Sequence, residues 1–204
     1  SLDEYDWADL IDQEDKVRML ISPQSEYALA GAWAMGRAMD DALIAAATGT
    51  AYGGVAGGTS VSLPSGNKVA HASGGLTLAK LLSAKEIIDA SDVDPEEPRF
   101  VVCAAGQIAD LLNVTQVTSA DYNTVKALAQ GEIDTYLGCK FIRSQRLGTD
   151  SDGNRQVLMF TQSALGLALG ADITTKISER ADKNYATQVF LSMTIGATRI
   201  EEEK

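Results

Sequence analysis

The sequence contains a single histidine, His71, among 204 residues. A Ser-His-Asp triad needs one well-placed imidazole, and a multi-histidine metal site needs at least two, so the lone loop histidine is interpreted as solvated or structural. The two cysteines, Cys103 and Cys139, are far apart in sequence and lie in apolar surroundings. They lack the spacing of a metal or redox pair and are interpreted as buried and inert. We therefore predict no catalytic residue, no metal and no cofactor.

Basic residues are also scarce, because 17 Lys and Arg face 28 Asp and Glu, which gives a formal net charge of −11. This balance disfavours direct binding to a phosphate backbone. No run approaches the roughly 20 apolar residues of a bilayer-spanning helix, and the start is too acidic for a signal peptide. We expect no specific nucleic-acid binding, no membrane insertion, and synthesis in a reducing cytoplasm.

The remaining composition is that of a folded chain, with 45% hydrophobic and 22% charged residues. The length allows one core or two small, closely packed subdomains.

The first half is dominated by one long helix. Residues 3–15 form an acidic segment with apolar residues at mixed spacing, interpreted as an arm lying across another surface. Ser22 and Pro23 are a helix start, and the helix is predicted to run to about residue 47. Its expected buried stripe consists of Ala28, Ala32, Met35, Met39 and Leu43.

Residues 49–75 are rich in Gly, Ser and Thr, and are predicted to be a flexible excursion with a short hairpin around residues 59–63. The glycine-rich stretch 49–58 follows a helix and leads into a hairpin, which is the wrong context for a phosphate loop. A second helix is predicted over residues 78–90. It is capped by Thr77 and buries Leu78, Leu81, Leu82 and Ile88.

The second half mixes strands and helices. Residues 100–103 have the all-apolar pattern of a strand covered on both faces. Helices are predicted at 105–113 and at 122–130, the latter capped by Asp121. Further strands are expected at 133–137, 140–143, 157–161, 165–169, 173–180 and 185–200, with a turn at 152–154. There is no regular βα alternation, so the class is α+β.

Acidic clusters do not form convergent pairs. Asp40-Asp41 and Glu96-Glu97 are neighbours that diverge, and residues 201–203 are interpreted as a solvated tail. Arg180, Lys183, Asn184 and Tyr185 form a polar cluster that is either an exposed strand entry or a contact between subunits.

Three groups of short sequence segments are similar to a known family. They are SEYA, GRAMDD and IAAA within residues 25–47; SADYNTVKAL, GEID and LGCKFIRS within 119–144; and DKNYATQ and GATRIEE within 182–202. In this order they resemble the spine helix, axial domain and closing strand of tailed-bacteriophage major capsid proteins with the Hong Kong 97 fold.

The resemblance implies a long spine helix, a peripheral domain and an axial domain. Residues 1–75 would hold the N-terminal segment, spine helix and peripheral hairpin, residues 76–150 mostly axial domain, and residues 151–204 the rest of the axial domain and the peripheral return strand. It implies a virion protein, made in a bacterial host from a phage or prophage, that assembles with itself into pentamers and hexamers of an icosahedral shell. Scaffold, portal or decoration proteins are further candidate partners. The predicted subunit contacts are Val117, Thr118, Ser119, Asp121, Tyr122 and Asn123 near a symmetry axis, with Arg180, Lys183, Asn184 and Tyr185.

Family members carry an N-terminal arm and an extended loop, and we expect this sequence to begin after most of both and to have no cross-linking residues. Two alternatives remain open. An encapsulin-like shell would hold a cargo enzyme through a lumenal groove, and a small acidic enzyme would work through carboxylates in a cleft.

Overall fold

The computed structural model describes residues 2–12, 23–72, 74–113 and 135–204. The chain divides into two compact units, each formed from two separate stretches. The first unit comprises Ser1–Leu43 and Leu167–Ala197, and the second comprises Ile44–Gly166 and Thr198–Lys204. Helices and strands occur together throughout, so the predicted α+β class is confirmed.

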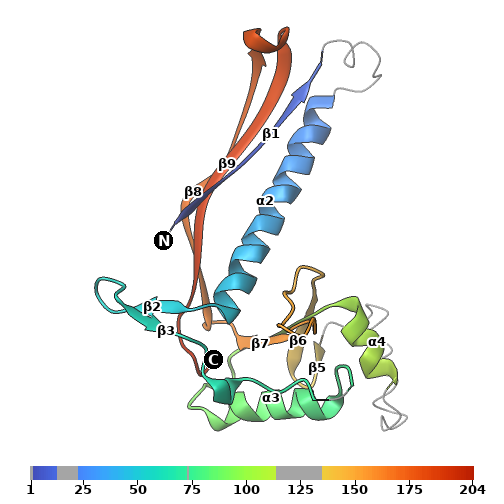
Figure 1. Cartoon of the computed structure of the whole chain (residues 1–204), viewed down its shortest axis with the longest axis vertical. Helices are drawn as coiled ribbons and strands as arrows, with labels where there is room; N and C mark the ends of the chain where they lie inside the picture. Colours follow the sequence, from blue (N-terminus) through green and yellow to red (C-terminus); the bar gives the residue numbers. More distant parts are fainter. Residues whose placement is uncertain (1, 13–22, 73, 114–134) are drawn as a thin grey trace. The chain divides into compact units, whose positions relative to one another are not determined.

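The first unit contains a three-stranded sheet of order β1-β9-β8 (Figure 1). Its strands are β1 (Asp3–Ile11), β9 (Ala186–Arg199) and β8 (Leu165–Arg180). The central strand β9 points every second side chain into the core, as the two-residue period of a strand requires. These inward residues are Val189, Leu191, Met193 and Ile195, all almost fully buried.

The long helix α2 (Pro23–Thr48) confirms the helix that Ser22-Pro23 predicts, although Ser22 itself lies outside the described residues. Met35 is buried in the same cluster as β9, and Ala28 and Met39 pack against it, as expected. The prediction that Ala32 belongs to this stripe is wrong, because Ala32 is exposed. The buried position is Gly31, one residue earlier, since the packed face of this helix also includes Ala38 and Ala42 and is rotated relative to the predicted stripe.

The interpretation of residues 3–15 as an arm over another surface is wrong for the described part. Residues 3–11 are strand β1, which pairs antiparallel with β9 from Asp3↔Ile195 to Ile11↔Thr187. Tyr5 and Trp7 pack against the core cluster that contains Ile11. Asp9 interrupts the apolar alternation of this strand, so its sequence does not show a clean period of two.

The predicted separation of strands 165–169 and 173–180 is also wrong. They form one 16-residue strand, β8. Gly170 and Asp172 are turn-forming residue types, but β8 stays extended beside β9, because cross-strand pairing outweighs local propensity.

The second unit contains a mixed sheet of order β5-β6-β4-β7. Its strands are β5 (Thr135–Tyr136), β6 (Cys139–Arg143), β4 (Arg99–Cys103) and β7 (Leu158–Thr161). Strand β4 is parallel to β6 and antiparallel to β7. Val101 and Val102 belong to different core clusters, so both faces of β4 are covered, as predicted. The turn between β5 and β6 has positive φ at Leu137 and Gly138, which is typical of a two-residue hairpin.

Helix α3 (Leu78–Ala90) has the predicted bounds, and the Thr77 hydroxyl accepts from the Lys80 amide at 3.4 Å, which confirms the cap. Leu81 is only 2% exposed, whereas Leu82 is 47% exposed. The prediction that both are buried is therefore wrong for Leu82, because adjacent helical positions point about 100° apart. Helix α4 (Ala105–Asn113) is also confirmed.

The excursion after α2 contains a hairpin, as predicted, but its strands are β2 (Ala51–Gly53) and β3 (Thr59–Val61). The glycine-rich stretch therefore forms the first strand and the turn of this hairpin instead of leading into it, and the short 3-10 turn η1 (Ser65–Asn67) follows. The turn at 152–154 is confirmed by positive φ at Gly153 and by the flanking bridge Thr149↔Arg155. The predicted helix 122–130 and its cap lie outside the described residues.

The acidic end of the chain is not a solvated tail. The Lys204 carbonyl accepts from the Thr161 amide at 3.0 Å, and the Asn67 side chain donates to the Glu202 carbonyl. The run of three glutamates gave no indication of these contacts, because they are made by the backbone rather than by the acidic side chains.

Candidate assembly surfaces

The two cysteines have the inert character that the sequence predicts. Both are free and buried. Burial raises the pKa of the Cys103 thiol to about 11, and burial also raises the pKa of Cys139. Neither thiolate is accessible at neutral pH, so neither side chain is a nucleophile or a ready metal ligand.

Two carboxylates that line a hollow of the second unit accept hydrogen bonds from backbone amides. This hollow has a volume of about 880 Å³ and includes Asp110 and Asp150 in its wall. Asp110 accepts from the Leu76 amide at 3.3 Å, and Asp150 accepts from the Asn154 amide at 2.8 Å. Among the described residues, no group of three or more His, Cys, Asp and Glu could hold a metal ion. None of the helices in the described ranges has the length and hydropathy to cross a bilayer.

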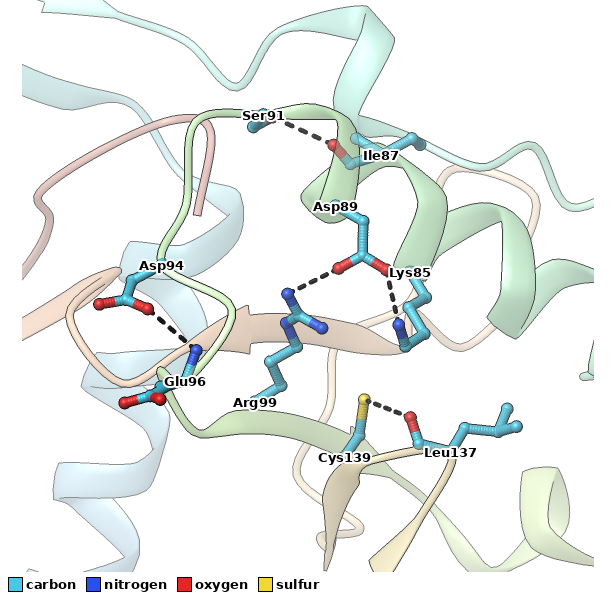
Figure 2. Close-up of polar contacts among 9 residues, drawn as sticks. All are labelled: Lys85, Ile87, Asp89, Ser91, Asp94, Glu96, Arg99, Leu137 and Cys139. Carbon is cyan, nitrogen blue, oxygen red and sulfur yellow. Dashed lines mark hydrogen bonds and ion pairs between the residues drawn. The ribbon is translucent and has the colours of Figure 1, made fainter.

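Asp89 links α3 to the first residue of β4. Figure 2 shows its carboxylate between the side chains of Lys85 and Arg99. Oδ2 lies 2.6 Å from Lys85 Nζ, and Oδ1 lies 2.6 Å from an Arg99 guanidinium nitrogen. The hydrogen bond from Lys85, followed by the charge of Arg99, holds the pKa of Asp89 below its ordinary value. The neighbouring Glu96 amide donates to Asp94, which closes the turn that leads into β4.

Glu97 belongs to the acidic pair interpreted as surface charges, but its side chain makes a hydrogen bond to a distant part of the chain. Its carboxylate accepts from the Ser163 amide at 2.7 Å. Hydrogen bonding from the Ser163 side chain, and then from its amide, lowers the pKa of Glu97. The side chain therefore connects the turn before β4 to the turn after β7.

Arg199, near the end of β9, is a residue whose role the sequence pattern did not indicate. Its side chain is buried, and one guanidinium nitrogen donates to the carbonyls of Ala47 and Gly49 at 3.2 and 2.9 Å. The other terminal nitrogen donates to the Val61 carbonyl at 3.0 Å. Arg199 thus donates hydrogen bonds to carbonyl groups at the C-terminal end of α2, which have no partner within the helix. It also donates to the last residue of β3 at the base of the β2–β3 hairpin. Two features of the sequence indicate such a role. The last turn of α2 has no basic residue of its own, and Arg199 is a basic residue at the end of a long predicted strand.

The hairpin that Arg199 holds presents apolar side chains to solvent. Tyr52 on β2 and Val55 at the tip are both largely exposed. Positive φ at Gly54 and Gly57 allows the chain to reverse between them.

The four described residues of the predicted subunit contact lie together in the connection between β8 and β9. Arg180 ends β8, Lys183 belongs to the 3-10 turn η2 (Ala181–Lys183), and Asn184 and Tyr185 follow it. Arg180 Nε donates to Asp182 at 2.7 Å, and another guanidinium nitrogen donates to Gln188 at 3.1 Å. The hydrogen bond from Arg180 lowers the pKa of Asp182 to about 2. The ion pair between Arg180 and Asp182 therefore stabilises this connection at neutral pH.

Tyr185 has an unusual combination of backbone and exposure. Its φ is 57° and Asn184 has a φ of 50°, both in the left-handed region. Asparagine is tolerated there, but a bulky tyrosine is an outlier. The residue is 59% exposed, so packing in the core does not account for this conformation. The other predicted contacts, from Val117 to Asn123, lie outside the described residues.

A second exposed apolar surface lies on α2, away from the sheet. Leu29 and Trp33 are four positions apart, so they lie on one face of the helix, and Trp33 is 61% exposed. Exposed tryptophans are enriched at protein interfaces.

Comparison with known proteins gives a consistent result. The model of a family described as phage capsid protein matches residues 1–204. No curated protein matches the chain. Among solved structures, a chain of Mycobacterium phage Che8 is similar with 24% identity and a TM-score of 0.67, covering 98% of this chain and 68% of that chain.

Two further capsid structures have the same arrangement. That of cyanophage P-SCSP1u has 18% identity and a TM-score of 0.66, covering 98% of this chain and 70% of that chain. That of Ralstonia phage GP4 has 12% identity and a TM-score of 0.66, covering 98% and 69%. The expected Hong Kong 97-type fold is confirmed.

Proposed function

The chain belongs to the phage capsid protein family, and from this membership we propose that its copies join in rings of five and six within an icosahedral virion shell. The protein is a structural major capsid protein of a bacteriophage. The match of the family model to residues 1–204 is the observation that carries this conclusion. The role is structural rather than catalytic: the fold provides the surfaces through which copies of the chain repeatedly contact one another.

The two units take different parts in this shell. The first unit, with α2 and the long strands β8 and β9, has the peripheral role. The second unit contains the mixed sheet and carries the axial elements. Residues 117–123 belong to the second unit's stretch of the sequence and are proposed to surround the symmetry axis.

The connection between β8 and β9 is proposed as a contact between neighbouring copies. Tyr185 is exposed in a strained conformation, and such outliers are concentrated at functional positions. Lys183 and Asn184 add an unburied charge and an amide next to it. Many modest contacts of this kind give a stable shell, because each further contact within an assembly is effectively intramolecular.

The partner is primarily the chain itself, with scaffold, portal or decoration proteins as further partners. The net charge of −11 supports a wall that does not bind the phosphate backbone of the enclosed genome.

Assembly is tested by negative-stain microscopy and light scattering of the purified chain, alone and with a candidate scaffold protein. Rings of five or six, or closed shells, are expected. A strictly monomeric protein under all these conditions would contradict the proposal.

The contact at the β8–β9 connection is tested with Lys183→Glu and Tyr185→Asn. Asparagine accepts positive φ more readily than tyrosine, so Tyr185→Asn leaves the fold at least as stable and isolates the loss of the ring. We expect both variants to reduce the fraction of assembled protein. The matched control is Lys68→Glu, at another exposed lysine, which should assemble as the unchanged protein does.

A further inference from the structure

Strand β8 presents an open edge along its whole length. It is the last strand of the β1-β9-β8 sheet, so β9 occupies only one of its two sides. In the part of the chain that the structure describes, no strand pairs with the other side. A 16-residue edge is long for a protein that avoids strand addition, and such edges are templates for pairing with another chain.

The residues on one face of β8 form an apolar stripe. Leu169 and Ile177 are 55% and 49% exposed, and Ile173 between them packs partly against the core cluster of the first unit. They lie on the same face, because side chains alternate along a strand with a period of two. Thr174 lies on the opposite face, where its hydroxyl is 2.9 Å from the Ser192 hydroxyl.

This stripe is self-complementary. Leu169 and Ile177 each lie four positions from Ile173. If two copies of β8 pair antiparallel with Ile173 opposite Ile173, Leu169 of each copy lies opposite Ile177 of the other. Directly opposite apolar side chains are the main unit of sheet stabilisation. A shift of one residue would move the stripe of one copy to the opposite face, so this register is specified.

The charged residues of β8 agree with the same register. Lys176 lies opposite Gly170, and Asp172 lies opposite Thr174, so no like charges face each other. Lys176 is then the diagonal neighbour of Asp172 in the other copy, at a separation that long side chains can span. The two-fold axis produces this attractive contact twice.

We propose that β8 of one copy pairs antiparallel with β8 of a second copy about a two-fold axis at Ile173. This inference rests on the proposed function, because assembly of the chain with itself is what supplies the second copy. The contact is isologous and generates a two-fold axis, whereas contacts within a ring of five or six are heterologous. The β8 pair therefore joins one ring to the next.

Cysteine cross-linking tests the register directly, because the native cysteines are buried and give little background. In the proposed pair, Cα atoms of directly opposite residues lie within the range that a disulfide spans. Ile173→Cys is therefore expected to form a covalent dimer on mild oxidation. Thr175→Cys is the matched control. It lies on the same face, but its two copies would be offset by four residues, about 13 Å, which is too far for a disulfide.

A second pair of variants is independent of the partly buried position 173. Leu169→Cys and Ile177→Cys, both at exposed sites, should each form no covalent dimer on oxidation alone and form a covalent mixed dimer when the two proteins are oxidised together. Equal cross-linking of Ile173→Cys and Thr175→Cys, or no mixed dimer from Leu169→Cys with Ile177→Cys, would overturn the inference. Cross-linking of Ile173→Cys to Asp6→Cys instead would assign the edge to β1 of another copy and also overturn it.

Microscopy of the same samples separates this inference from the proposed function. Rings without the cross-link would refute the β8 pair and leave the capsid role intact. A cross-linked dimer that never forms rings or shells would support the pair and count against the proposed rings.

Discussion

The indole ring of Trp7 on β1 packs directly against Gly31 on α2. A Cβ atom at position 31 would lie 2.8 Å from Trp7 Cε3 and 2.7 Å from a terminal methyl carbon of Leu191. Only a glycine allows this approach, so the distance between the helix and its sheet depends on the absence of one methyl group. The nearby Gly36 differs, because a Cβ atom there would have no neighbour within 4 Å.

Replacing each of these glycines by alanine should have opposite effects. Gly31→Ala is expected to lower the free energy of unfolding by about 1–2 kcal/mol, because the Trp7 ring and the Leu191 side chain must shift. Gly36→Ala should raise it by about 0.5–1 kcal/mol, since alanine is the better helix former and has free space. Urea titrations of both variants measure the difference. A stabilised Gly31→Ala would show that the packing is looser than described.

The adjacent leucines of α3 offer a second matched pair. Leu81 is buried in the cluster of the second unit, whereas Leu82 is exposed. Leu81→Ala should lower the free energy of unfolding by about 3 kcal/mol, because it leaves a cavity. Leu82→Ala should change it by less than about 1 kcal/mol. Similar losses in the two denaturation curves would contradict the assignment of the buried face.

The helices of this chain were predictable because local signals mark their ends. Thr77 caps α3, and Pro23 opens α2 at the first turn, where its missing N–H has no cost. The helix bounds follow from residues within a few positions of each end. Which side chain is buried was less predictable, as Ala32 and Leu82 show, because that depends on the partner surface.

The strands of the first unit could not be predicted from local signals. β1 and β9 pair although more than 170 positions separate them, and nothing within residues 3–11 indicates that partner. β8 crosses Gly170 without a break for the same reason. Arg199 is the clearest case, because its bond to Gly49 joins residues 150 positions apart. Tertiary contacts of this kind decide the structure where propensity is neutral.

Arg199 should be essential for the stability of the β2–β3 hairpin. Arg199→Met removes the donor of three hydrogen bonds and leaves carbonyl groups without a partner, so a loss of about 3 kcal/mol is expected. Amide hydrogen exchange in β2 and β3 should accelerate more than in β4. The control, Arg37→Met at an exposed position of α2, should change the free energy of unfolding by less than about 0.5 kcal/mol. Equal exchange rates in β2 and β3 before and after Arg199→Met would show that the hairpin is held by other contacts.

The contribution of Asp89 should depend on pH. Its pKa in the folded chain is lowered from the ordinary 3.8 by the hydrogen bond from Lys85 and by the charge of Arg99. A carboxyl group whose pKa is lower in the folded state stabilises that state at every pH above the unfolded pKa. This stabilisation is lost as the pH falls below about 4 and through the folded pKa.

Asp89→Asn removes both ion pairs, and the difference from the unchanged chain measures their contribution at each pH. Because the carboxylate is partly exposed, the difference at pH 7 should be no more than about 1 kcal/mol. It should shrink progressively as the pH falls below about 4, as Asp89 itself becomes neutral in the unchanged chain. Denaturation midpoints of both proteins from pH 7 to pH 3 test this, with Asp92→Asn, at an exposed carboxylate, as the control. A difference that stays constant across this range would mean that Asp89 acts through packing rather than through its charge.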